Sequence, residues 1–217
     1  SSDLQGATEL VQEGLILPPI RLVRRGVLDE ATLELILANV RTPEERRGDL
    51  AAQRSACAAG AAGWRALLAR EGAERLQAGC DALLAYTARR ASARLSEFGS
   101  AVGHAEDLLE GDGVSDRPVP LVLRAAVADG TLHLDFTGTS PRVRGNVNCP
   151  IAVTRSAAMF VLRSLMADDV PTNEGIARPL SISTPADCLL NAIWPSAVAA
   201  GNVETSQRVT DLIFAAL

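Results

Sequence analysis

Two side chains that could serve as a general base or as metal ligands, His133 and Asp135, stand two positions apart in an alternating apolar segment. Residues i and i+2 of a strand point to the same face, so the two side chains would be neighbours. A histidine–aspartate pair can accept a proton or bind a metal ion. The alternative, which the pattern by itself favours, is a solvent-facing strand surface. His104 has no such partner and is interpreted as a surface residue.

The segment "DFTGTSPRVRGNVNCP", residues 135–150, could bind an anion. Gly138, Thr139 and Ser140 offer backbone N–H groups and hydroxyls, and Arg142 and Arg144 offer positive charge. Its spacing matches no phosphate-binding motif.

A structural role for the same segment is the alternative. Ser140 and Pro141 would form the corner of a tight turn, and Asn146 and Asn148 would hold irregular backbone. Local chemistry alone slightly favours this turn over a binding loop.

The segment "AAGNVETSQR" offers a second candidate site at the start of a predicted helix. Its polar residues there are Asn202, Glu204, Thr205 and Ser206. The positive end of the helix dipole could take a carboxylate or phosphate group. Plain helix capping, with Glu204 balancing the dipole, is the alternative.

Composition excludes several chemistries. The chain has 217 residues and a formal charge of −5, which argues against a general nucleic-acid binder. All 21 basic residues are arginine, so no P-loop, Schiff-base or general-base lysine exists within this chain. No apolar run approaches the ~20 residues of a membrane span. The cysteines form no C-x-x-C pair, which favours free thiols in a reducing cytoplasm; they are Cys57, Cys80, Cys149 and Cys188.

The elements that must position these residues fall into two parts. Asp29 is predicted to cap a short helix. Thr42-Pro43-Glu44-Glu45 predicts a helix start with a capping box between Thr42 and Glu45. Two long helices follow to about Phe98, broken near Gly72, and an antiparallel helical hairpin is expected.

The second part is mixed. Residues 121–136 predict a β-hairpin turning at Asp129-Gly130, with Leu132, Leu134 and Phe136 on one face. A helix is predicted over 151–166, with Phe160 among the residues of its apolar face, followed by a strand in "RPLSIST". Asn202 is predicted to cap the last helix.

These patterns predict an α+β fold: a long antiparallel helical hairpin followed by a mixed α/β segment with a small sheet. The expected division is an extended lead-in and hairpin over 1–98 and the mixed segment over 99–217, both parts of one larger domain. The chain begins without methionine and stops inside an apolar helical pattern. We therefore expect a piece of a longer polypeptide.

Six ordered segments resemble the hydantoinase B/oxoprolinase family, and the resemblance covers nearly the whole chain. They are "VQEGLILPPIRLVRRGVLDE", "LILANVRTPEERRGDLAAQ", "GVSDRPVP", "DFTGTSPRVRGNVNCPIAVTRSA", "DDVPTNEGIARPLSISTPADCLLN" and "AVAAGNVETSQRVTD". The family includes B-type components of ATP-dependent hydantoinases, the corresponding half of 5-oxoprolinase, and large subunits of acetone-carboxylase-type enzymes.

The resemblance implies a cytoplasmic enzyme that opens a cyclic amide, such as hydantoin or 5-oxoproline, at the expense of ATP. A hydantoinase A-type partner would bind ATP in a hetero-oligomer, and neither nucleic acid nor membrane is expected as a partner. Two alternatives are an ATP-dependent ketone carboxylase subunit and a non-catalytic scaffold or subunit-interface piece.

Family members carry a histidine- and aspartate-rich metal region upstream of the segment that matches Glu13-Gly14-Leu15. The resemblance therefore implies a divalent metal in the full-length protein but no metal ligands in this segment, which we expect to be inactive alone. The predicted catalytic residues are Asp135, Asn202 and Glu204. The predicted substrate-binding residues are Gly138, Thr139, Ser140, Arg144, Asn146, Asn148, Thr205 and Ser206.

Overall fold

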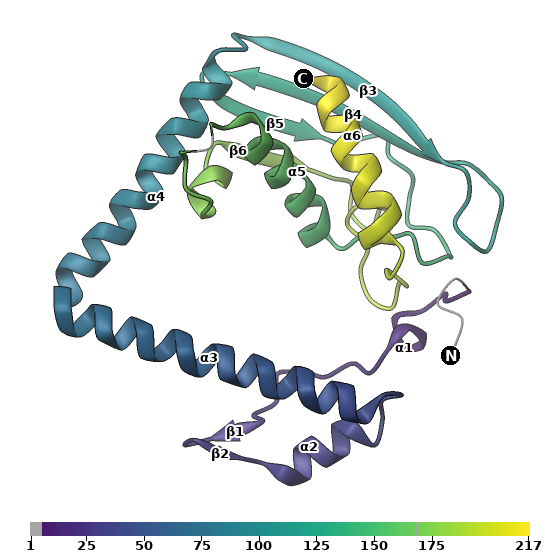
Figure 1. Ribbon diagram of the computed structural model, residues 1–217. Helices are drawn as coiled ribbons and strands as arrows, with labels where there is room; N and C mark the ends of the chain where they lie inside the picture. The colour runs from purple at the N-terminus through teal and green to yellow at the C-terminus, as the bar shows by residue number, and fades with distance from the viewer. Residues whose placement is uncertain (1–5, 168) are drawn as a thin grey trace. The chain divides into compact units, whose positions relative to one another are not determined.

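The computed structural model describes residues 6–167 and 169–217 (Figure 1). They form two compact units. The larger unit comprises Ser1–Glu13 and Asp81–Leu217, and the smaller unit comprises Gly14–Cys80. Each unit is described by itself.

The smaller unit contains a hairpin and two helices. Arg25 and Gly26, both with positive φ, turn the chain between β1 and β2. Asp29 caps α2 as predicted, because its carboxylate accepts a hydrogen bond from the Thr32 N–H at 3.1 Å. The elements are β1 (Val23–Arg24), β2 (Val27–Leu28), α2 (Glu30–Leu37) and α3 (Pro43–Glu71).

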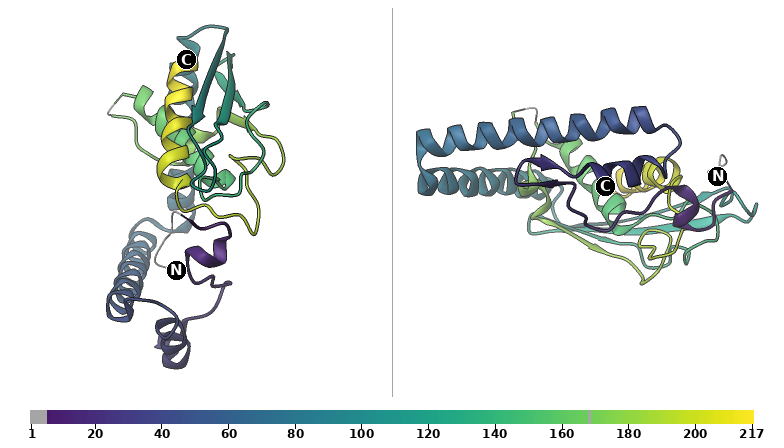
Figure 2. Two further views of the ribbon diagram at one scale, coloured as in Figure 1. Left: turned by 90° about the vertical axis from the view of Figure 1, so that its right-hand side faces the viewer. Right: turned by 90° about the horizontal axis from the view of Figure 1, so that it is seen from below.

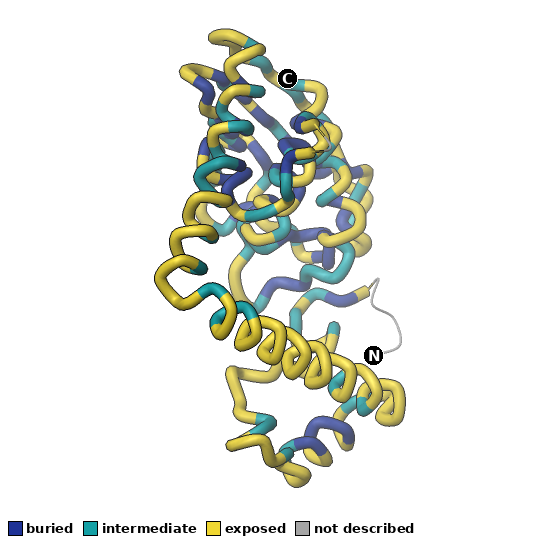
Figure 3. Tube along the Cα trace, turned by 60° about the vertical axis from the view of Figure 1, so that its left-hand side comes forward, coloured by how far each residue is buried: buried dark blue, intermediate teal, exposed yellow. Residues whose placement is uncertain are grey.

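Helix α3 begins at Pro43, as the sequence predicts, and ends before Gly72, whose φ of 79° favours glycine. The predicted capping box is wrong, because the Thr42 side chain makes no capping hydrogen bond. None of the residues of α3 is buried, as its exposed colouring in Figure 3 shows. The second long helix, α4 (Ala73–Ser96), continues into the larger unit, where it buries Thr87, Ala91 and Leu95.

The larger unit is built on a four-stranded sheet in the order β3-β4-β5-β6. The first three strands are antiparallel neighbours, and β6 runs parallel to β5. The predicted hairpin turn is confirmed, since Asp129 and Gly130 both have positive φ. The edge strand β3 was not predicted. The strands are β3 (Ala101–Leu109), β4 (Val119–Ala128), β5 (Thr131–Asp135) and β6 (Leu180–Ser183).

Two helices, α5 (Ile151–Leu165) and α6 (Ser206–Ala216), lie on one face of this sheet and contact each other (Figures 1 and 2). Leu132, Leu134 and Phe136 point into the core beneath them, as predicted. The predicted apolar face of α5 is wrong at Phe160, which is 60% exposed. Short turns of helix complete the unit: α1 (Leu10–Glu13), η1 (Glu174–Ala177) and the π-helical turn η2 (Gly201–Thr205).

Long helices followed by a mixed sheet with covering helices confirm the α+β class. Among the described residues, no helix is long and apolar enough to cross a membrane.

Candidate functional site

Three connecting segments leave the sheet at the same end. Leu109, the last residue of β3, pairs with Val119, the first of β4, and Asp135, the last of β5, pairs with Ser183, the last of β6. The segments 110–118, 136–150 and 184–200 must therefore start or finish at this end. They include parts of four of the six segments that carry the family resemblance.

Backbone hydrogen bonds join the 135–150 segment to the start of the last helix. The Asn146 carbonyl accepts hydrogen bonds from the N–H groups of Ala200 at 3.0 Å and Gly201 at 3.1 Å. The Thr205 hydroxyl donates to the Val147 carbonyl at 2.5 Å. The structure thus brings together the two segments in which most of the site residues were predicted.

The last helix begins later than predicted. Gly201–Thr205 form a π-helical turn, and α6 starts at Ser206 rather than just after Asn202. The wider turn accompanies a close approach, because a Cβ on Gly201 would overlap the carbonyl oxygen of Asn148. Asn202 and Glu204 are exposed on this turn, and π-helical turns are frequent at functional sites.

Several predicted binding residues hold the loop itself. The Asn148 amide is fully buried and donates to the carbonyls of Val143 at 3.0 Å, Gly145 at 2.7 Å and Ala197 at 3.1 Å. The Thr139 hydroxyl accepts from the N–H of Val122 at 3.0 Å and donates to the carbonyl of the same residue at 3.1 Å. These bonds give both residues a structural role, and their contact with substrate stays a prediction.

Three further predicted binding residues occupy turns. Gly138 has a φ of 100°, a conformation that favours glycine. The Ser140 hydroxyl donates to the Pro141 carbonyl at 3.0 Å, and the Ser206 hydroxyl donates to the Asn202 carbonyl at 2.9 Å. Asn146 is buried and also has an interaction partner.

Asp135 and His133 lie on the sheet face opposite α5 and α6, because they alternate with buried Leu134. The Asp135 carboxylate accepts hydrogen bonds from the Thr137 hydroxyl at 2.7 Å and N–H at 3.0 Å, and these bonds hold the pKa of Asp135 below its usual range. His133 Nδ1 forms a hydrogen bond with the Ser181 hydroxyl at 2.8 Å. Within the described part of the chain, no hydrogen bond or ion pair connects Asp135 with Asn202 or Glu204.

The described residues do not fit a divalent metal site. No three of their His, Cys, Asp or Glu side chains gather closely enough to hold a metal ion. The mechanism proposed below therefore contains no step that depends on a metal bound to this segment.

Asp112 is a site residue that the sequence analysis missed. Its buried carboxylate accepts hydrogen bonds from the N–H groups of Val114 at 2.9 Å, Ser115 at 2.7 Å and Gly145 at 3.0 Å. Burial acts to raise the pKa of Asp112, but these backbone donors outweigh it and lower the pKa. The sequence signal was the "DGVS" turn, in which an aspartate can accept from the two following N–H groups; its bond to Gly145 is not visible in sequence.

Glu13 is a second missed residue. Its carboxylate accepts hydrogen bonds from the N–H groups of Val198 at 2.9 Å and Ala199 at 2.7 Å. It thereby ties the N-terminal segment of the larger unit to the loop preceding Gly201. The signal was its place in the "VQEG" motif, but its partners are 185 and 186 positions away.

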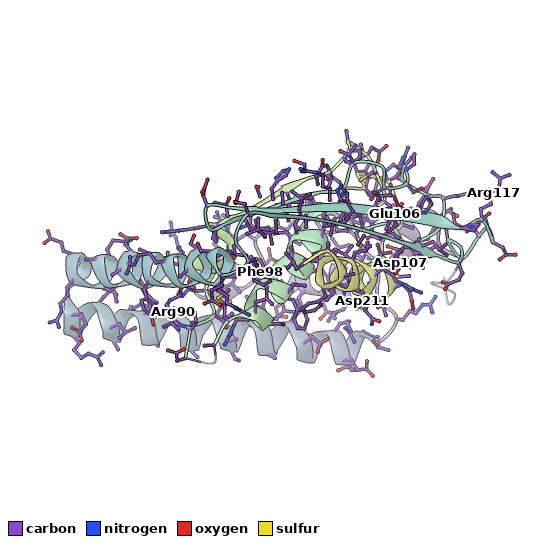
Figure 4. All side chains as sticks on the ribbon, turned by 90° about the horizontal axis from the view of Figure 1, so that it is seen from above. Arg90, Phe98, Glu106, Asp107, Arg117 and Asp211 are labelled. Atoms are coloured by element: carbon purple, nitrogen blue, oxygen red, sulfur yellow. The ribbon has the colours of Figure 1, made fainter. Side chains whose placement is uncertain are left out.

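Two hollows flank Val143 and Arg144. One has a volume of about 470 Å³ and the other about 410 Å³. The first is also lined by Arg117, which lies in the loop beyond the end of β3 and β4, past Asp107 (Figure 4). The second is also lined by Arg142, whose guanidinium pairs with Asp187 at 2.9 Å, and by Ser196. Arg144 is thus the predicted site residue that reaches both hollows.

Cys149 is not a nucleophile in this arrangement. Burial raises the pKa of its thiol to about 12, and the thiol donates to the Gly201 carbonyl at 3.1 Å. We expect the folded chain at pH 8 to react with a maleimide at exposed Cys57, while Cys149 and Cys188 react only after unfolding. Mass spectrometry of labelled peptides measures this, and rapid labelling of Cys149 in the folded chain would contradict it.

The family model for hydantoinase B/oxoprolinase matches residues 2–217, so the chain belongs to this family of ATP-dependent amide hydrolases and carboxylases. The resemblance noted in the sequence is confirmed. The 5-oxoprolinase 1 of Arabidopsis thaliana is 32% identical over 94% of this chain and 18% of that protein. A protein of a Pseudomonas species, named for the B-type component of a D-/L-hydantoinase, is 29% identical over 100% of this chain and 38% of that protein.

Solved structures share the fold. The ATP-dependent caprolactamase from Pseudomonas jessenii aligns with a TM-score of 0.80 and 25% identity, over 94% of this chain and 35% of that one. An acetone carboxylase aligns with a TM-score of 0.76 over 91% of this chain and 28% of that one, and at 15% identity it shows the fold alone. The chain thus spans less than two fifths of the length of these four proteins.

Proposed function

We propose that this chain is a segment of the B-type component of an ATP-dependent cyclic-amide hydrolase, which opens hydantoin or 5-oxoproline with an ATP-binding A-type partner. The observation that carries the proposal is the joining of two family motifs, at Asn146–Asn148 and Ala200–Thr205, at one end of the sheet. The 5-oxoprolinase and hydantoinase relatives support the substrate class.

The chemistry would proceed by activation of the amide. Transfer of a phosphoryl group from ATP to the amide oxygen converts a poor electrophile into an imidate-like phosphate. Water then attacks the ring carbon, and the C–N bond breaks as phosphate is released. Hydrogen-bond donors fixed in place stabilise the charge that develops.

This chain would supply donors rather than the nucleotide site. Asn202 is exposed on the π-helical turn, and Arg144 is exposed between the two hollows, so both side chains are accessible to a ligand. Glu204, exposed on the same turn as Asn202, could accept a proton from the attacking water. Asp135 keeps its predicted role on the other face of the sheet as a separate test.

The assay joins the full-length B-type component with its A-type partner and measures ATP cleavage that depends on 5-oxoproline or hydantoin. Asn202→Ala is expected to lower kcat about 100-fold, as loss of one preorganised donor does. Gln207→Ala removes an exposed amide on α6 and is the matched control, with turnover expected to stay unchanged.

Three outcomes contradict parts of the proposal. If Asn202→Ala and Asp135→Ala both leave turnover unchanged, the choice of site is wrong. Bicarbonate-dependent product formation from a ketone would identify a carboxylase instead. If the chain binds the A-type partner and no site variant affects turnover, a scaffold role replaces the catalytic one, and the exposed length of α3 favours that role for residues 29–98.

A further inference from the structure

Arg117 and Arg144 line the same hollow of about 470 Å³, together with the hydroxyl residues Ser115 and Ser140. Both arginines are exposed, and among the described residues neither guanidinium has a hydrogen-bond or ion-pair partner. Arg142, by contrast, is paired with Asp187 at 2.9 Å. The hollow therefore holds two guanidinium groups that no carboxylate of the described chain neutralises by direct contact.

The charge balance of the hollow favours an anion. Asp112 is the single acidic side chain among the described residues that line it, so two positive charges face one negative charge and the sum is +1. The Asp112 carboxylate is engaged by three backbone N–H groups and accepts nothing from either guanidinium. This local charge is opposite in sign to the −5 of the whole chain.

The backbone that carries Arg144 is fixed on both sides. On one side, the Val143 N–H donates to the Asn148 Oδ1 at 2.8 Å. On the other, the Gly145 N–H donates to Asp112 at 3.0 Å, and its carbonyl accepts from the Asn148 amide at 2.7 Å. A guanidinium displayed from a fixed backbone binds an oxyanion with less loss of chain entropy.

We propose that this hollow is an oxyanion subsite in which Arg117 and Arg144 bind a carboxylate or phosphoryl group. Asn148 and Asp112 are positioning residues that hold the backbone on either side of Arg144. The identity of the ligand rests on the proposed function, since the carboxylate of 5-oxoproline and the phosphoryl group of its activated form are both oxyanions. The subsite itself depends only on the two arginines and their support.

Calorimetric titration of the 217-residue chain with inorganic phosphate, and separately with 5-oxoproline, tests the proposal. Arg117→Gln and Arg144→Gln are each expected to weaken binding about tenfold, the effect of losing one charge-assisted hydrogen bond. Arg89→Gln is the matched control, because Arg89 is exposed on α4 in the same unit and does not line the hollow. Its affinity is expected to equal that of the wild type.

Selective binding of phosphate identifies the phosphoryl group, selective binding of 5-oxoproline identifies the carboxylate, and binding of both supports a shared subsite. The proposal is overturned if neither probe binds, if both hollow variants bind like wild type, or if Arg89→Gln weakens binding equally. Anion binding without ring opening in the full assay would refute the proposed function and leave the subsite standing. Ring opening that is unaffected by Arg117→Gln and Arg144→Gln would do the reverse.

Discussion

Gly201→Ala is expected to lower the free energy of unfolding of the larger unit by about 3 kcal/mol, the upper end of the usual cost of overpacking. An added Cβ would overlap the Asn148 carbonyl oxygen and lie 2.7 Å from its carbon, and both are backbone atoms that a side-chain rotation cannot move. Relief requires separating the 146–149 segment from the π-helical turn. The bonds from Gly201 to Asn146 and from Thr205 to Val147 would weaken together.

Urea unfolding followed by Trp194 fluorescence in a Trp64→Phe background measures this change, because Trp194 belongs to the larger unit and Trp64 to the smaller. Gly60→Ala is the control. Its added methyl meets no atom within 4 Å, and it is expected to stabilise α3 by about 1 kcal/mol because alanine favours the helix. Equal unfolding midpoints for wild type and Gly201→Ala would show that the close approach does not exist in solution.

Asp112→Ala is expected to lower the free energy of unfolding by about 2–4 kcal/mol at pH 7, because it leaves three buried or half-buried backbone N–H groups without their acceptor. It should also release the Arg144 loop, since Gly145 loses its bond to the 110–118 segment. Asp112→Asn keeps the shape and one acceptor oxygen, so a smaller loss is expected. Urea unfolding at pH 7 gives both values.

The effect of Asp112 should depend on pH in one direction. Its pKa is lower in the folded state than in the unfolded state, so its stabilisation is present above the unfolded pKa of about 3.9. The stabilisation is lost as the pH falls below that value and through the folded pKa. The difference between wild type and Asp112→Asn should therefore shrink in acid.

Asp116→Asn is the matched control for the pH experiment. Asp116 is exposed four positions away, and the substitution makes the same change of charge and shape. It should alter stability by less than about 0.5 kcal/mol at any pH, as surface substitutions usually do. A difference between wild type and Asp112→Asn that stays constant down to pH 2 would argue that the ionised carboxylate is not what stabilises the loop.

Local elements were predictable because short-range physics determines them. The start of α3 at Pro43, its end at Gly72 and the turn at Asp129-Gly130 each follow from backbone preferences of a few adjacent residues. The alternation in β5 likewise predicted which side chains are buried. Whether residues 1–98 and 99–217 belong to one larger domain stays a prediction.

Where tertiary packing decides, the predictions were incomplete or wrong. Helix α5 turns Phe160 outward and buries Thr154, whose hydroxyl donates to the Leu190 carbonyl at 2.7 Å. A periodic pattern gives the existence of a helix, but neighbouring elements choose which part of its surface is covered. Strand β3 was not predicted because it is an edge strand, and much of it, including Val102 and Leu108, is exposed on a segment of weak polar–apolar contrast.

By itself, the sequence determined the family, the α+β class and the two segments that could form a site, because ordered motifs and local periodicity are written in adjacent residues. Only the tertiary structure decided what each polar residue in those segments does. It engages Asn148 and Thr139 in holding backbone, pairs Arg142 with Asp187, and leaves Arg144 facing a hollow with Arg117. These roles depend on hydrogen bonds between residues tens of positions apart, such as that of Gly145 with Asp112 across 33 positions, which no local pattern encodes.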